Sequence, residues 1–253
     1  NKGKITGILL FTAMLLGVVY LSVVNKKIEE KIKVIDVTGN NYLTKEQYLN
    51  FLKLNNIYDF KFLSLHIIKS RFEKHPYIDK ADVKFRTRNE ILVNIQERKF
   101  EAVLLKDSSE FLITKEFELI PKISPIRNFD LPVIYNPESD RSMKSFSSFK
   151  NDDTKTAFRI LESAKLINSG LYNDLAEINL RRGHDIVLGF RGFDFPVVVG
   201  RGNETEKILY FKQVWDKLRD KNVNQLDINY IDLRFDKIIY IGTNDTLNVV
   251  KGV

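Results

Sequence analysis

The sequence predicts an α+β protein in which an N-terminal transmembrane helix precedes two folded units. Three observations predict this class. Residues 5–24 form an uncharged run, residues 26–98 carry the patterns of a strand, two helices and two strands in that order, and residues 99–253 are rich in short strand patterns interrupted by two helices. We therefore expect a short stub and membrane helix over residues 1–25, a first unit over 26–98 and a second, mostly antiparallel unit over 99–253.

The apolar run over residues 5–24 predicts a single membrane span. A helix of twenty residues is roughly 30 Å long, which matches the hydrocarbon core of a bilayer. A cleaved signal peptide is the alternative, but its apolar stretch is usually about 7–15 residues and ends in a small-x-small site, whereas this run ends in Ser22-Val23-Val24-Asn25. We therefore expect a retained anchor, with a buried core helix as a third interpretation. Because two lysines stand on each side of the run, charge leaves its orientation open.

The amino-acid composition limits the classes of partner and the types of reactive site that are expected. The formal net charge is +7, which could indicate nucleic acid or an anionic membrane surface. However, Lys and Arg are scattered singly among Asp and Glu, with no run of five like charges, so a mixed solvated surface is expected and no nucleic-acid partner. The chain has no cysteine, which excludes disulfides, thiolate metal sites and cysteine nucleophiles.

The first unit begins with a strand and a helix. Residues 31–37 alternate with the period of two that is typical of a half-buried strand, and Gly39-Asn40-Asn41 predicts a turn. Thr44 and Gln47 then form a capping-box pattern, in which each side chain accepts a hydrogen bond from the backbone N–H of the other. A helix is therefore expected to begin at Thr44.

A second helix and a hairpin complete the first unit. Ser64 is a suitable N-cap for a helix whose apolar residues include Ile68 and Phe72, and Pro76 would end it. Residues 81–85 and 91–95 alternate apolar and polar side chains around a short turn, which predicts an antiparallel hairpin. No glycine-rich or proline-rich linker follows, so we expect the two units to abut.

The second unit carries several strand patterns and two helical ones. Its candidate strands are 102–106, 110–114, 175–181, 185–190 and 195–199.

One helix is expected over residues 151–169, ending at Gly170, and another over 203–218, with Asn203 at its start. An apolar stripe on the second helix, expected to face the core, consists of Ile208, Phe211, Trp215 and Leu218. The polar, serine-rich residues 136–153 predict a surface loop.

Two strand patterns, residues 229–235 and 237–241, lie near the end of the sequence. A terminal strand easily becomes the edge of a sheet, where unpaired N–H and C=O groups can pair with another polypeptide. These residues therefore predict a way of binding a partner that needs no active site.

A search for catalytic and metal-ligating patterns identifies no active site, cofactor site or metal site. The three histidines, His66, His75 and His184, have no metal-ligand spacing, and His66 and His75 are expected on the surface. Gly200-Arg201-Gly202 before a helix could hold an anion at the helix N-terminus. A tight strand-to-helix turn that requires glycine is the alternative explanation of this motif.

Several stretches together resemble the FtsQ/DivIB family of bacterial cell-division proteins, and the resemblance covers nearly the whole chain. The first unit is similar to a POTRA domain in residues 35–40 (IDVTGN), 75–83 (HPYIDKADV) and 91–98 (ILVNIQER). Two later stretches point to FtsQ among POTRA proteins. They are residues 199–202 (VGRG) before a helix and 230–235 (YIDLRF) near the end.

The resemblance implies a scaffold of the division machinery that has no catalytic activity. Such a protein crosses the bacterial inner (cell) membrane once, with its C-terminal part in the periplasm or outside the cell, and is enriched at the division septum. The POTRA unit would recruit other division components, and the last strand would receive a strand from an FtsB-like protein in complex with an FtsL-like protein. The implied partner-binding residues are Arg201, Tyr230, Arg234, Phe235, Lys237 and Ile239.

The resemblance and the chemistry of these residues agree in part. Arg201 and Arg234 would suit carboxylates of an acidic partner segment, because a guanidinium can bind a carboxylate through two hydrogen bonds. Alternatively, Arg234 pairs with Asp232 or a neighbouring strand. Phe235 stands where the family pattern has tyrosine, so a contact through a hydroxyl would be absent here.

Two other classes of function remain as alternatives. A POTRA-containing component of outer-membrane assembly or two-partner secretion would need a long series of lipid-facing strands, which the length of the chain and the retained helix disfavour. A membrane-anchored cell-wall enzyme would need a nucleophile, a metal site or an acid/base pair that the sequence does not identify.

Overall fold

The computed structural model describes most of the chain. The described residues are 7, 11–20, 32–56, 63–123, 130–139, 142–219, 228–243 and 247–251. Residues 11–20 form a helix with exposed apolar side chains such as Phe11 and Met14, and the rest of the predicted span 5–24, apart from residue 7, lies outside the described residues. Across the described part of the chain, no helix combines the length and apolar character needed to cross a bilayer.

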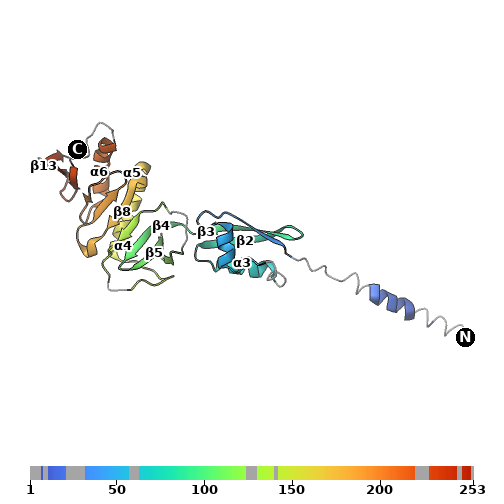
Figure 1. Cartoon of the computed structure of the whole chain (residues 1–253). Helices are drawn as coiled ribbons and strands as arrows, with labels where there is room; N and C mark the ends of the chain where they lie inside the picture. Colours follow the sequence, from blue (N-terminus) through green and yellow to red (C-terminus); the bar gives the residue numbers. More distant parts are fainter. Residues whose placement is uncertain are drawn as a thin grey trace.

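In the described residues, the first unit consists of a three-stranded sheet with two helices (Figure 1). Its elements in order are β1 (Val34–Thr38), α2 (Lys45–Phe51), α3 (Leu65–Glu73), β2 (Ile78–Thr87) and β3 (Glu90–Glu97). Strand β3 lies in the centre, parallel to β1 and antiparallel to β2. The predicted order of one strand, two helices and two strands is confirmed.

Both helix starts of this unit follow the capping signals. The Thr44 hydroxyl accepts a hydrogen bond from the Gln47 N–H at 3.2 Å, and the Gln47 side chain accepts one from the Thr44 N–H at 2.7 Å, which confirms the capping box. The Ser64 hydroxyl accepts a hydrogen bond from the N–H of Ile67 at 3.3 Å, as its position predicted. These bonds satisfy N–H groups that have no partner within a helix.

His66 is exposed as expected, but the expectation that His75 lies on the surface is wrong. His75 is 1% exposed, and its ring lies against the rings of Tyr48 and Phe51 at centroid distances of 4.7 and 4.4 Å. Its Nδ1 accepts a hydrogen bond from the N–H of Tyr77 at 3.1 Å. Burial lowers the pKa of His75 to about 4 because the charged imidazolium would lose its hydration.

Within its described residues, the second unit has one mixed sheet, three α-helices and the 3-10 helix η2 (Arg181–Gly183). The strands are β4 (Phe100–Lys106), β5 (Ser109–Thr114), β6 (Leu119–Pro121), β7 (Val133–Tyr135), β8 (Leu175–Asn179), β9 (Val187–Phe190), β10 (Val197–Val198), β11 (Ile228–Asp232), β12 (Ile238–Thr243) and β13 (Leu247–Lys251). The helices are α4 (Asp152–Ile167), α5 (Ser169–Asp174) and α6 (Glu204–Arg219).

Within the described residues, these ten strands are ordered β13-β12-β11-β10-β9-β8-β7-β4-β5-β6. The pairs β4–β7, β7–β8 and β10–β11 are parallel, and the other neighbouring pairs are antiparallel. The sheet is therefore mostly antiparallel, as expected, but mixed.

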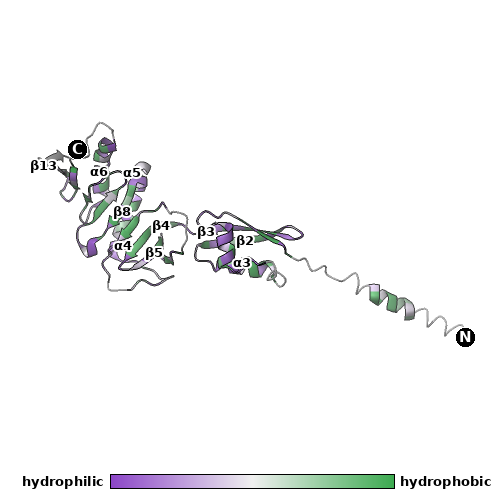
Figure 2. Ribbon diagram, viewed as in Figure 1, coloured by the Kyte–Doolittle hydropathy of each residue, from purple (hydrophilic) through white to green (hydrophobic). Residues whose placement is uncertain are grey.

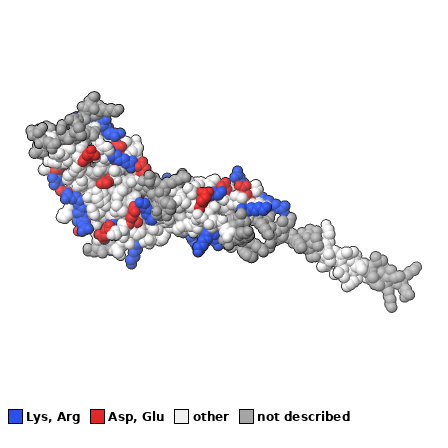
Figure 3. Space-filling view, viewed as in Figure 1, with Lys and Arg blue, Asp and Glu red and all other residues white. Residues whose placement is uncertain are grey.

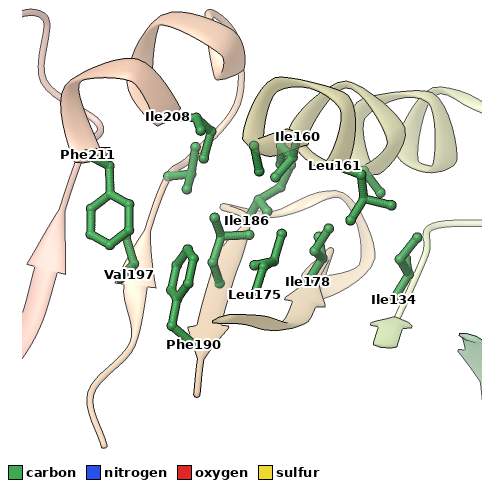
Figure 4. Packing of buried hydrophobic residues seen from close by; sticks show 14 of the residues in the cluster. Ile134, Ile160, Leu161, Leu175, Ile178, Ile186, Phe190, Val197, Ile208 and Phe211 are labelled. Carbon is green, nitrogen blue, oxygen red and sulfur yellow. The ribbon is translucent and has the colours of Figure 1, made fainter. Parts of the chain in front are cut away.

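The helices α4 and α6 lie over one face of this sheet and form the core with it. Figure 4 shows Ile160 of α4 and Ile208 and Phe211 of α6 packed onto side chains of β8, β9 and β10. The hydrophobic strands β4, β5 and β8 are evident in Figure 2. The predicted apolar stripe of α6, including Trp215 and Leu218, is buried, which confirms that it faces the core.

The prediction that Gly170 ends the helix over 151–169 is wrong. Asn168 is extended, with φ −162°, and its side chain accepts a hydrogen bond from the N–H of Leu171 at 2.9 Å, which starts the additional helix α5. A Cβ on Gly170 would lie 3.0 Å from Cη2 of Trp215. Glycine therefore permits close packing here and does not end the helix.

The predicted loop over residues 136–153 is only partly a surface loop. Residues 140–141 lie outside the described residues, and Asp152 and Asp153 belong to α4. Phe149 is 6% exposed and belongs to the core, whereas Phe146 is 56% exposed. The polar composition of this segment gave no indication that Phe149 belongs to the core.

The C-terminal strands form one end of the large sheet. Strand β11 pairs with β10 in parallel and with β12 antiparallel. Residues 237–241 were expected at the sheet edge, but β13 pairs along the outer side of β12, so β13 is the outermost of the described strands at this end. Leu247, Val249 and Val250 favour strand conformation, and their segment supplies backbone partners to β12.

The two units abut. Apolar residues of the first unit share one cluster with Phe100, Val103, Leu112 and Ile120 of β4, β5 and β6. The hydroxyl of Tyr77 also accepts a hydrogen bond from the N–H of Ile123 at 2.7 Å. The units therefore meet through a common apolar core, at the end of the large sheet opposite to β13 (Figure 1).

Candidate partner-binding site

The turn over residues 199–202 brings the two late sequence motifs into contact. Gly200 and Gly202 have φ of +67° and +82°, a conformation that favours glycine. A Cβ on Gly200 would lie 2.8 Å from Cγ of Arg234. Glycine at position 200 therefore lets the side chain of Arg234, which follows β11, cross directly over the turn.

Arg201 fastens this turn to two other parts of the second unit. Its Nε donates a hydrogen bond to the carbonyl of His184 at 2.9 Å, and its Nη2 donates one to the carbonyl of Leu180 at 3.1 Å. Its Nη1 lies 2.8 Å from Oδ1 of Asp153, whose side chain is 5% exposed. The guanidinium is thus directed to acceptors within the chain.

The first turn of α6 holds the same loop from the other side. Nζ of Lys207 donates a hydrogen bond to the carbonyl of Val199 at 2.9 Å, and the Glu204 side chain accepts one from the N–H of Gly202 at 2.7 Å. Asn203, expected to cap the helix, has φ +55°. The side chain of Glu204, the first residue of α6, therefore accepts the hydrogen bond from the backbone N–H of Gly202.

Arg234 is held by two carboxylates of its own chain. Its Nε and Nη2 donate hydrogen bonds to Asp232 at 3.0 and 2.6 Å, and its Nη1 donates one to Asp185 at 2.8 Å. These bonds, to Asp232 first and then to Asp185, raise the pKa of Arg234. Burial alone would raise the pKa of Asp232, but its hydrogen bonds with Arg234 outweigh burial and lower it. The alternative that Arg234 pairs with Asp232 is confirmed as a contact.

A hollow of about 230 Å³ lies between the N-terminal part of α6 and the β11–β12 connection. Five of the six predicted partner-binding residues line it, namely Arg201, Arg234, Phe235, Lys237 and Ile239. Ile239 is only 3% exposed and forms part of its apolar wall, whereas Phe235 is 50% exposed. The structure thus brings together residues that are separated by up to 38 positions in the sequence, counted from 201 to 239.

Tyr230, the sixth predicted residue, is not among the residues lining this hollow. Its ring packs over Gly242, where any Cβ would clash with it. Phe235 meets Tyr240 edge to face, with ring centroids 4.7 Å apart. The side chain of Tyr230 is 37% exposed.

Sequence reasoning missed the residues that hold the site together. Asp153 and Asp185 anchor Arg201 and Arg234, but each lies 48 or 49 positions from its partner, and no local pattern connects them. Lys207 was detectable in principle, because a lysine one turn into a helix after a glycine turn can reach back to the carbonyls of that turn.

The described residues include no group of three His, Asp or Glu placed to hold a metal ion. On the face in view, basic and acidic side chains are interspersed over both units (Figure 3). The site combines an apolar wall, an exposed aromatic ring and internally paired charges. This chemistry suits the binding of a polypeptide.

Comparison with known proteins identifies the family. The family model described as "POTRA domain, FtsQ-type" matches residues 30–98. The family model described as "Cell division protein FtsQ/DivIB, C-terminal" matches residues 102–234. The second match ends at Arg234, so Phe235, Lys237 and Ile239 lie beyond it.

Two relatives are each named cell division protein DivIB. The relative from Clostridium tetani (strain Massachusetts / E88) is 22% identical over 179 residues, which cover 70% of this chain and 66% of the relative. The relative from Bacillus subtilis (strain 168) is 28% identical over 123 residues, which cover 48% of this chain and 45% of the relative. The aligned part of the chain thus spans less than two thirds of either relative. Because the C-terminal family description alone matches more than half of the chain, the chain belongs to the FtsQ/DivIB family of cell-division proteins.

Proposed function

We propose that this protein is a non-catalytic scaffold of the bacterial division machinery that binds FtsB-like and FtsL-like proteins for septal cell-wall synthesis. Membership in a cell-division family supports the process. The gathering of five predicted partner-binding residues around one hollow, beside the C-terminal strands, is the observation that carries the binding role. The partner contributes a strand at the C-terminal end of the large sheet, where main-chain hydrogen bonds supply affinity and side-chain pockets supply specificity.

The protein lies in the cell membrane at the septum. Residues 5–24 supply an uncharged run of the length of a single span, and the part that follows is placed in the periplasm or outside the cell. The POTRA unit, residues 26–98, recruits other division components. The unit over residues 99–253 holds the FtsB-like partner, and neither nucleic acid nor a cofactor takes part.

The six site residues divide into two roles under this proposal. Arg201 and Arg234 position the binding surface, because their guanidinium groups are bonded to acceptors of the same chain. Phe235 and Tyr230 contact the partner through exposed aromatic surface. Ile239 forms part of the apolar wall of the hollow that receives the partner, and Lys237 contacts the partner through its exposed side chain. Aromatic residues of this kind often contribute most of the binding energy of an interface.

The test is the affinity of the full chain, reconstituted in lipid nanodiscs, for the purified FtsB-like and FtsL-like complex of the same organism. Phe235→Glu should weaken binding by about 30-fold, because the loss of an aromatic hot spot costs about 2 kcal/mol or more. Phe146→Glu is the matched control, since Phe146 is 56% exposed and is not among the residues lining the hollow. Both variants should retain the circular dichroism spectrum of the unchanged protein.

Two results would contradict the proposal. Equal weakening by Phe235→Glu and Phe146→Glu would show that the hollow has no special part in binding. Absence of binding by the unchanged protein would remove the FtsB-like and FtsL-like proteins as partners.

A further inference from the structure

We propose that the partner strand takes the place of β13, so that the C-terminal segment of the chain occupies its own binding edge until the partner arrives. This inference rests on the proposed function and names how the site is regulated. Strand β13 pairs antiparallel with β12 over five residues, from Ile238 opposite Lys251 to Gly242 opposite Leu247. The edge of β12 is therefore already occupied by the chain itself.

The position of the site residues favours replacement over addition outside β13. Neighbouring strands lie about 4.8 Å apart, so a strand outside β13 would be about 10 Å from β12. Phe235, Lys237 and Ile239 belong to β12 or to the connection that precedes it. A strand paired directly with β12 has these residues as immediate neighbours, whereas a strand beyond β13 does not.

The pairing also defines the chemistry of the strand that fits. Ile239 and Ile241 face the core, with Ile239 buried and Ile241 packed against the core cluster. Residues directly opposite each other in an antiparallel pair share one face of the sheet. The partner strand should therefore carry apolar, preferably β-branched, residues opposite Ile239 and Ile241.

The sequence of β13, which now pairs with β12, matches this apolar pattern only in part. Val250 stands opposite Ile239, but Asn248 stands opposite Ile241. An apolar residue of a partner strand at the second position would bury apolar surface against Ile241. The partner can thus compete with β13 for the same edge.

Strand β12 does not depend on β13 for its place. On its other side it pairs with β11, with Ile231 opposite Ile241 and Asp232 opposite Tyr240. Ile239 is 3% exposed within the core. Exchange of β13 for a partner strand therefore leaves the receiving strand anchored.

The test is a reversible covalent staple in the full chain. Ile238 and Lys251 are opposite each other, and cross-strand neighbours lie within the Cα separation that a disulfide spans. The chain has no cysteine of its own, so the double variant Ile238→Cys/Lys251→Cys forms this bond alone. Affinity for the FtsB-like and FtsL-like complex is measured for the oxidised and the reduced form of the same protein, with Lys251→Cys as the control.

Oxidation should weaken binding at least about tenfold, because the edge is then closed, and reduction should restore it. Equal affinity of the two forms would overturn the exchange, while the proposed function would stand because both forms bind. Absence of binding by the reduced form, by the control and by the unchanged protein would overturn both together.

A second variant removes the occupant. A stop codon in place of Asn244 ends the chain after Thr243, which is the last residue of β12. This shortened chain should bind the complex more tightly than the full chain by a factor of about ten, because no segment has to leave the edge first. Loss of binding in the shortened chain would show that β13 itself receives the partner, and would overturn the inference.

Discussion

The two carboxylates that hold Arg234 should contribute very differently to the stability of the binding end. Asp232 is 6% exposed at its side chain and Asp185 is 43% exposed, while Arg234 is 45% exposed. Breaking a fully buried pair costs about 3–5 kcal/mol, and an exposed pair contributes about 0.2–1 kcal/mol. Since water reaches Arg234, we expect Arg234→Ala to cost about 2 kcal/mol, mainly because the carboxylate of Asp232 loses its guanidinium partner and keeps only the hydrogen bond from the N–H of residue 234.

Amide hydrogen exchange in the full chain measures this loss of stability at β11. The N–H groups of Ile231 and Leu233 donate to the carbonyls of Pro196 and Val198 at 3.0 and 2.8 Å, so they report opening of β11 from β10. Arg234→Ala should speed their exchange by about 30-fold at pH 7, which corresponds to 2 kcal/mol. Asp185→Ala should speed it by less than about fivefold.

Arg182→Ala is the matched control for this measurement. Arg182→Ala removes another arginine in an exposed ion pair, whose side chains are 73% and 68% exposed, and should leave these amides unchanged. If Asp185→Ala accelerates exchange as much as Arg234→Ala, the burial of Asp232 is not the source of the effect and the reasoning fails.

Two further predictions concern the POTRA unit and the turns. Because burial lowers the pKa of His75 from 6.5 to about 4, the unfolded chain binds the extra proton between these values, so stability should fall by up to about 3 kcal/mol as pH drops from 6.5 to 4. Urea unfolding of His75→Gln, which keeps a hydrogen-bond acceptor without this titration, should show a smaller pH dependence, and an unchanged dependence would refute the assignment. Gly39→Ala should lower the melting temperature more than Gly202→Ala, because both glycines have positive φ but only Gly39 has a backbone carbonyl, that of Ile95, in the place of a Cβ. Equal shifts would contradict the steric argument.

Local sequence signals predicted the first unit, because its helices and its hairpin each have a recognisable pattern in the sequence. The capping residues Thr44 and Ser64 mark both helix starts, and the alternation over 81–85 and 91–95 marks the hairpin. His75 was misjudged because its position just after a helix suggested solvent. Only the tertiary fold brings Tyr48 and Phe51 around its ring.

The second unit was predictable in type but not in detail. Strands of two or three residues, such as β6, β7 and β10, are too short to show a period, and β10 was expected to be longer than it is. Gly170 follows the rule for a helix end, but the large ring of Trp215 accounts for it instead. The family resemblance selected the site residues, whereas the carboxylates that orient Arg201 and Arg234 could come only from the three-dimensional arrangement.

The apolar cluster shared by the two units constrains how the protein can be divided for experiments. A cut near residue 99 would uncover Phe100, Val103, Leu112 and Ile120, which are each at most 7% exposed in the intact chain. Contiguous apolar surface of this kind promotes association in water. A β unit produced alone should therefore self-associate, so apparent oligomers of such a fragment would reflect the severed boundary and not the assembly state of the whole protein.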